Sequence, residues 1–188
     1  MSNEKLTTYM NELLAYNKHF LTVVRSQKTD SKVQNTKAIE LMHHIDMAIT
    51  TQIAAMEKFD DLIGESNMDA IKNTAAKVAG KVAGGIDSMR EDPVSKMLRD
   101  DYAALSMQAS GYTMLYTVAT ALDRDDLAEF SKSSLEKTAQ LITETSQTLP
   151  YVVASEFMED ESDALKVAEK ALEETQEAWK PENMFEEA

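Results

Sequence analysis

The chain has 188 residues, 43% of them hydrophobic and 28% charged, which is the composition of a single globular domain. Its 33 Asp and Glu outnumber 19 Lys and Arg, and this net charge of −14 argues against direct binding to nucleic acid or to an anionic membrane surface. The chain has no cysteine, which excludes disulfides, thiol catalysis and thiolate metal sites. With 5 Gly, 3 Pro and no bilayer-length apolar run, we expect an all-α, cytoplasmic protein.

Apolar residues that recur every three and four positions predict two helices in the first third of the chain. The first is expected over 3–26, with Asn17 on its buried stripe, and the second over 32–62. Polar residues 27–31 form the turn between them, and Gly64 is expected to stop the second helix. A turn this short implies that the two helices are antiparallel neighbours.

A crossover with its own helix is predicted next, over about 67–89. Within it the sequence Lys-Val-Ala-Gly occurs twice in succession, over 77–84. Small residues four positions apart allow a helix to approach another closely. We interpret the repeat as a tightly packed crossover helix, because a phosphate-binding loop needs a different glycine pattern after a strand.

Two further long helices are predicted in the second half of the chain. Pro93 suits the first turn of a helix over 94–122. Residues 123–126 form the following turn and helix cap, and the next helix is expected over 127–148, ending before Pro150. We expect these two helices to form a second antiparallel pair.

A final acidic helix is predicted over about 162–179, followed by a loose tail. Its apolar stripe consists of Leu165, Ala168, Leu172 and Trp179. This helix is expected to cover the bundle or to mediate a dimer. The predicted organisation is therefore a helical bundle over 1–160, a C-terminal acidic helix over 161–180 and a tail over 181–188.

Two antiparallel helix pairs joined by one long crossover have the connectivity of ferritin-like bundles rather than of simple up-down bundles. The predicted fold class is therefore all-α: a ferritin-like four-helix bundle with a crossover helix and a C-terminal helix. A fold of this kind supports many functions, so function has to be inferred from particular residues.

Residues 92–138 resemble the YciE/YciF-type ferritin-like proteins, a bacterial family linked to stress responses. The resemblance is carried by Tyr-Thr-Met-Leu-Tyr-Thr-Val-Ala-Thr-Ala-Leu at 112–122, and by Leu-Glu at 135–136 after a short turn. A weaker match covers 13–16 on the first helix and 52–53 on the second. The resemblance implies a ferritin-like fold and a stress-related role.

The family's metal-ligand pattern is mostly missing from this chain. Other residues stand where the resemblance places ligands: Leu105, Ser106 and Gln108 on the third helix, Lys137 and Thr138 after Glu136 on the fourth, Met47 and Ala48 on the second, and His19 on the first. Two adjacent divalent ions need several anionic oxygens to balance their charge. A complete di-iron oxidase site is therefore not expected.

Glu40 and His43 form the only Glu-x-x-His pair in the chain, which is half of the motif that a di-metal bundle uses. If the first hairpin turns near Ser31, His19 and His43 lie at nearly equal distances from the turn. His19, Glu40 and His43 are therefore candidate ligands for a single transition-metal ion. The interpretation that we favour is plainer: Glu40 and His43 form an ordinary side-chain pair on a partly exposed helix.

The favoured function is a non-enzymatic ferritin-like bundle without a cofactor, acting by self-association or protein interaction as a homodimer or small homo-oligomer. The alternative is a metal-binding protein or a weak metal-dependent oxidase that uses His19, Glu40 and His43. A third hypothesis is a binding module whose interior, in a chain with 12 Met, accepts an apolar ligand.

Overall fold

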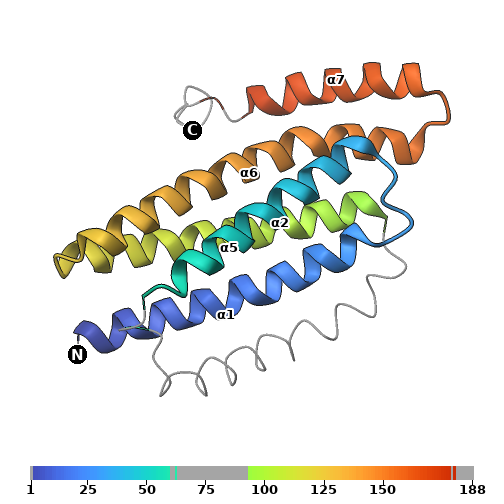
Figure 1. Cartoon of the computed structure of the whole chain (residues 1–188). Coiled ribbons are helices and arrows are strands. Elements are labelled where there is room, and N and C mark those ends of the chain that lie inside the picture. Colours follow the sequence, from blue (N-terminus) through green and yellow to red (C-terminus); the bar gives the residue numbers. More distant parts are fainter. Residues whose placement is uncertain (1, 60–61, 63–92, 179, 181–188) are drawn as a thin grey trace.

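The computed structural model describes residues 2–59, 62, 93–178 and 180, and this part of the chain is all-α, as predicted (Figure 1). Its helices are α1 (Ser2–Lys28), α2 (Thr36–Met56), α5 (Val94–Ala121), α6 (Asp125–Phe157) and α7 (Glu161–Glu177). None of these helices is both long enough and apolar enough to cross a membrane. The predicted crossover helix, Trp179 and the tail lie outside the described residues.

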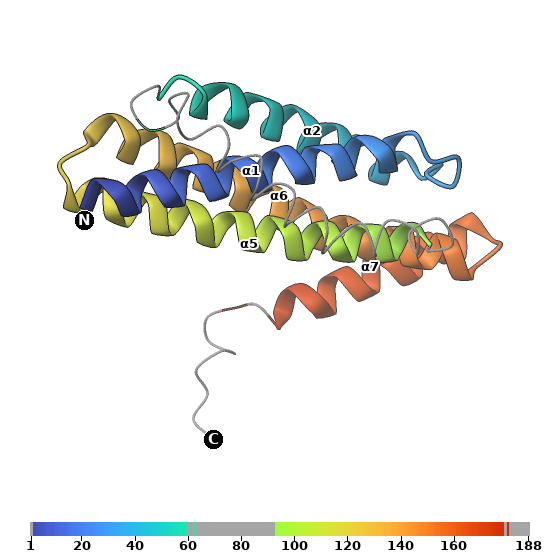
Figure 2. The same ribbon diagram turned by 90° about the horizontal axis from the view of Figure 1, so that it is seen from below.

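Four of the helices, α1, α2, α5 and α6, lie side by side as a bundle (Figures 1 and 2). The first two are antiparallel, and so are α5 and α6, whereas α2 and α5 run in the same direction. The end of α2 and the start of α5 are therefore at opposite ends of the bundle (Figure 1). This order of helix directions agrees with two antiparallel pairs joined by a long connection.

The bundle helices bury stripes of residues that are alternately four and three positions apart, the spacing that keeps one face of a helix against its neighbours. In α1 this stripe consists of Leu6, Met10, Leu13, Asn17, Phe20, Val24 and Gln27. In α5 it consists of Val94, Leu98, Asp101, Leu105, Gln108, Tyr112, Leu115 and Ala119. Both stripes contain polar residues, and the spacing places those residues in the core.

The buried stripe of α6 is dominated by hydroxyl side chains. It consists of Leu127, Ser131, Ser134, Thr138, Leu141, Thr145, Thr148 and Val152. The Ser131 hydroxyl donates to the Leu127 carbonyl at 2.7 Å, and the Thr145 hydroxyl donates to the Leu141 carbonyl at 2.7 Å. Because these bonds stay within one helix, the two hydroxyls are buried without becoming unsatisfied.

The predicted end of the fourth helix was wrong. The helix was expected to stop at 148, but α6 continues through Pro150 to Phe157. Beyond the proline, Val152 is 1% exposed and Ala154 is 5% exposed. Burial of these side chains outweighs the backbone hydrogen bond that Pro150 cannot donate.

The first hairpin also differs from the prediction. Gln27 was expected in the turn, but it is buried, and α1 continues to Lys28. The second helix begins at Thr36 rather than at 32, because Asn35 caps it: the Asn35 side-chain oxygen accepts hydrogen bonds from the backbone N–H groups of residues 37 and 38, at 3.0 and 3.3 Å. That helix ends at Met56 instead of at 62.

The last helix, α7, packs on α6 outside the four-helix bundle (Figure 1). Its contact is made by Ala164 and Ala168, which are buried together with Ala154 of α6. On the predicted apolar stripe, Leu165 is 48% exposed and Leu172 is only partly buried. Small residues therefore form most of this contact.

Candidate functional site

Gln108 of α5 connects the four helices at the centre of the bundle. Its Nε2 donates to Asn17 Oδ1 of α1 at 2.9 Å and to Gln52 Oε1 of α2 at 3.1 Å. The Thr138 hydroxyl of α6 lies 3.3 Å from its Oε1 and donates to it. Each helix thus contributes one buried side chain, and we call Asn17, Gln52, Gln108 and Thr138 the polar layer.

The polar layer satisfies its own hydrogen-bonding groups. Gln52 Nε2 donates to the Ser134 carbonyl at 3.2 Å and to Thr138 Oγ1 at 3.3 Å. Asn17 Nδ2 donates to the Tyr112 hydroxyl at 3.0 Å. None of the four side chains contains a buried polar atom without a partner. A buried network that is satisfied in this way is stable without a ligand.

The polar layer carries no charge at any physiological pH, because amides and aliphatic hydroxyls do not titrate there. The neighbouring Tyr112 is also neutral, since burial raises the pKa of its hydroxyl well above the usual value. Ions such as Fe²⁺ and Mn²⁺ in paired sites rely on carboxylate oxygens, which this layer lacks. The arrangement can join four helices in one register, but it cannot balance two divalent ions.

The structure does not bring the three candidate ligands together. Within residues 2–59 and the other described parts, no group of three or more His, Asp or Glu side chains is placed to hold a metal ion. Glu40 and His43 are exposed on α2, whereas His19 of α1 is partly buried and its Nε2 has no hydrogen-bond partner. Burial lowers the pKa of His19. Metal binding by these residues stays a prediction.

The positions that the resemblance linked to metal ligands are divided between core and surface. Gln108 and Thr138 belong to the polar layer, Leu105 and Ala48 are buried apolar residues, and Met47, Glu136 and Lys137 are exposed. Asn17 was predicted on a buried stripe and Gln52 belongs to the weaker match, but a hydrogen-bonded layer that contains both residues was not predicted. The available signal was that each polar residue occupies a buried stripe position.

A second buried polar contact joins α1 to α5. Asp101 is 1% exposed and Gln27 is 4% exposed, and Gln27 Nε2 donates to Asp101 Oδ1 at 3.1 Å. Asp101 Oδ2 and Gln27 Oε1 have no partner. Burial raises the pKa of Asp101 to about 7, against the opposing effect of the hydrogen bond from Gln27. The sequence prediction missed Asp101, although it lies between Leu98 and Leu105 on the apolar stripe.

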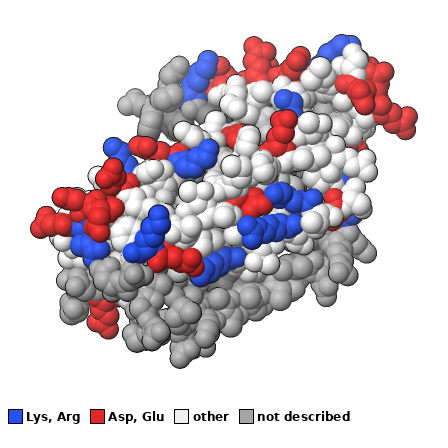
Figure 3. Space-filling view, in the orientation of Figure 1, with Lys and Arg blue, Asp and Glu red and all other residues white. Residues whose placement is uncertain are grey.

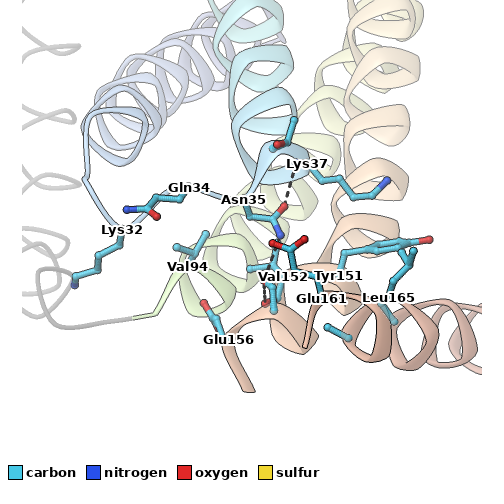
Figure 4. A pocket seen from close by; sticks show the side chains of 14 residues that line it. Lys32, Gln34, Asn35, Lys37, Val94, Tyr151, Val152, Glu156, Glu161 and Leu165 are labelled. Carbon is cyan, nitrogen blue, oxygen red and sulfur yellow. Dashed lines mark hydrogen bonds between the residues drawn. The ribbon is translucent and has the colours of Figure 1, made fainter. Parts of the chain in front are cut away.

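A cavity of about 630 Å³ lies where the start of α2 meets the end of α6 and the first half of α7 (Figure 4). Val152 and Leu165 form part of its apolar lining, and Lys37 Nζ lies 4.4 Å from the centre of the Tyr151 ring. Its volume suits a small molecule. Its polar groups, however, serve the protein itself: Asn35 caps α2 and also donates to the Ser155 hydroxyl at 3.2 Å. We assign no chemistry to this cavity.

Charged side chains are unevenly spread on the face shown in Figure 3. Acidic side chains gather at two ends of this view, over the α5–α6 turn and over the α6–α7 turn. The sequence has Asp123, Asp125 and Asp126 at the α5–α6 turn, and Glu159, Asp160 and Glu161 at the α6–α7 turn. In the described part of this face, lysines and arginines lie among acids along the middle and form no broad basic surface for a phosphate backbone.

Comparison with known proteins identifies no relative: no protein-family model, no curated protein and no solved structure matches the chain. The function therefore has to be inferred from the polar layer, the Gln27–Asp101 contact and the surface of the bundle.

Proposed function

We propose that this protein is a non-enzymatic ferritin-like bundle that acts by self-association or by binding another protein, in a stress-related role. The observation that carries the non-enzymatic part is the polar layer. Each of the four bundle helices contributes one neutral side chain to it, whereas a di-metal bundle places carboxylates and histidines there.

The ferritin-like part of the proposal is supported by the helix directions. Two antiparallel pairs, with α2 and α5 running in the same direction, require the chain to return along the bundle between the pairs. Ferritin-like folds have one long crossover of this kind. The stress-related role is what the resemblance to the YciE/YciF-type proteins implies.

The chemistry of the amides explains why this layer opposes metal binding. A glutamine has the shape of a glutamate but lacks its charge and carries two N–H donors. The N–H groups of Gln108 already occupy the amide oxygens of Asn17 and Gln52, so a cation would meet neutral, hydrogen-bonded oxygens and no carboxylate. A bound ion would also have to break the hydrogen bonds of the layer, and its own coordination would not compensate for them.

Metal loading tests this function. The untagged protein is stripped with a chelator, incubated separately with Fe²⁺, Zn²⁺ and Mn²⁺, desalted and analysed for metal content. We expect less than stoichiometric metal and an unchanged thermal midpoint, because a ligand bound to the native state raises that midpoint.

The variants His43→Ala and His44→Ala are compared in this experiment, because both residues are exposed neighbours on α2 and only His43 is a candidate ligand. His44 Nδ1 lies 2.6 Å from Glu144 Oε1 of α6, so metal content is the readout that compares the two variants. Stoichiometric metal that is lost in His43→Ala and kept in His44→Ala would overturn the non-enzymatic proposal in favour of the metal-binding alternative. Stoichiometric metal that both variants retain would overturn it in favour of another site.

A further inference from the structure

The outward face of α5 carries a second stripe, opposite the buried one, with the same alternating spacing of four and three. It consists of Ala103, Met107, Ser110, Met114, Thr117 and Ala121, all of them exposed, and we call these residues the outer stripe. Met107 is 65% exposed and Met114 is 47% exposed. A stripe with this spacing is the kind of surface that packs against another helix.

The outer stripe lies in a part of the chain that has no charge. Between Asp101 and Asp123 the sequence contains no Asp, Glu, Lys, Arg or His, although 28% of the whole chain is charged. Two copies that each carry a net charge of −14 repel one another. The outer stripe itself contributes no charge to a contact, and the acidic residue that lines the groove beside it is Glu12 of α1. The stripe is therefore a face at which two copies can meet at low electrostatic cost.

The polar members of the outer stripe are already satisfied. The Ser110 hydroxyl donates to the Ser106 carbonyl at 3.1 Å, and the Thr117 hydroxyl donates to the Thr113 carbonyl at 2.8 Å. Burial of these side chains in an interface therefore leaves no hydroxyl without a partner.

We propose that two copies of this chain associate through an antiparallel α5–α5 pair formed by the outer stripe. This proposal rests on the self-association in the proposed function and names its surface. An antiparallel pair with its two-fold axis at the level of Tyr112 places Met107 opposite Thr117 of the second copy. It places Met114 opposite Ser110, and Ala103 opposite Ala121. In this register each methionine faces a smaller side chain, and each contact occurs twice, as in any two-fold interface.

A groove beside the outer stripe offers further contact. It has a volume of about 440 Å³ and lies between α5 and α1, with Tyr9, Leu13 and Tyr16 on the α1 side (Figure 2 shows the two helices side by side). Met107 and Met114 line its α5 side. The flexible thioether of methionine adapts to irregular apolar surfaces, so the methionines of a second copy suit this groove.

Cysteine cross-linking tests the pairing, because the natural chain has no cysteine. The double variant Met107→Cys with Thr117→Cys is expected to form a covalent dimer under mild oxidation. The two positions lie roughly 15 Å apart along one helix, too far for a disulfide within a copy. Met107→Cys alone is the matched control. It should remain uncross-linked, since in the proposed pair the two cysteines at position 107 are also roughly 15 Å apart along the helix axis.

Light scattering over a concentration series separates this proposal from the function on which it rests. Met107→Lys with Met114→Lys should dissociate the dimer, whereas Met47→Lys on α2, where Met47 is 57% exposed, should leave it intact. A dimer that survives the double lysine variant and gives no cross-link overturns the outer stripe while self-association stands. A wild-type chain that is monomeric at every concentration overturns both.

Discussion

Gln27 and Asp101 meet in the core through one hydrogen bond, and each is left with one unpaired oxygen. The bond runs from Gln27 Nε2 to Asp101 Oδ1 at 3.1 Å, and the unpaired atoms are Asp101 Oδ2 and Gln27 Oε1. Both unpaired atoms are acceptors when the acid is ionised. A proton on Asp101 Oδ2 converts this atom to a donor. The protonated Asp101 can then donate to Gln27 Oε1 while it accepts from Gln27 Nε2, which makes two complementary hydrogen bonds.

The surroundings of Asp101 favour the protonated form. On its own helix, Asp100 raises the pKa of Asp101 further. On α1, burial raises the pKa of Tyr16 to about 12, with a smaller contribution from the charge of Asp101, so Tyr16 supplies no positive charge. Every buried residue of α6, the other helix that packs along α5, is uncharged. His19 of α1 is no source of positive charge near neutrality, since burial lowers its pKa.

We predict that stability falls as the pH rises through about 7. The folded chain holds the Asp101 proton with a pKa of about 7, compared with 3.8 for an ordinary aspartate. The stabilisation from this proton is therefore complete at pH values below the pKa of Asp101 in the unfolded chain. It declines as the pH rises between the two pKa values and is absent above the pKa in the folded chain. The total change is on the order of 4 kcal/mol. Urea unfolding at several pH values measures it.

Asp101→Asn is the control for this pH dependence, because an asparagine amide mimics the protonated acid and does not titrate. Its stability should fall less steeply with pH than that of the natural chain, while the titration of the histidines affects both proteins equally. The Cγ chemical shift of Asp101 gives a direct measurement without any variant. A shift that titrates near the ordinary pKa of aspartate would contradict the prediction.

Gln108→Leu is expected to destabilise the protein by about 3 kcal/mol, since it leaves Asn17 Oδ1 and Gln52 Oε1 without their donor. Gln108→Glu should also be destabilising near neutrality, but less so at low pH, because the buried acid can then be neutral. Chemical unfolding of the two variants at two pH values tests both statements. A free energy of unfolding in Gln108→Leu equal to that of the wild-type protein would mean that the polar layer contributes little to folding.

Asn35→Ala is expected to lower stability by about 1 kcal/mol, because the side-chain oxygen accepts hydrogen bonds from the second and third N–H groups of α2, those of Lys37 and Ala38. For a chain of this size, that loss corresponds to a decrease of about 2–4 °C in the thermal midpoint. Asn35→Asp keeps the capping oxygen and should retain most of the stability. Equal losses in the two variants would assign the effect to the amide contact with Ser155 instead.

Removal of the residues after Asp160 is expected to leave the four-helix bundle folded and the dimer intact. The deleted α7 packs mainly on α6, through the small contact made by Ala164 and Ala168. Circular dichroism should show helix lost only in proportion to the residues removed, and light scattering should still give the dimer mass. A monomeric product would move the interface from the outer stripe to α7.

Much of the architecture can be predicted from local patterns. Alternating spacings of four and three identify the helices and the buried side of each, because side chains three and four positions apart share one helix face. The same spacing placed Asn17 on a buried stripe, and the structure shows that Gln108, which was not predicted as a core position, follows it too. Boundaries are less predictable: α6 passes through Pro150 because residues beyond it find a tertiary surface to pack on.

The sequence by itself therefore determined that this protein is a set of amphipathic helices with polar residues in their buried stripes, since that information is local. The tertiary structure decided which polar side chains meet. Gln108 bonds to Asn17 across 91 positions of sequence and to Gln52 across 56, whereas His19, Glu40 and His43 do not assemble. Such pairings depend on the rotation and axial register of helices that are distant in sequence, and packing of the whole bundle sets both.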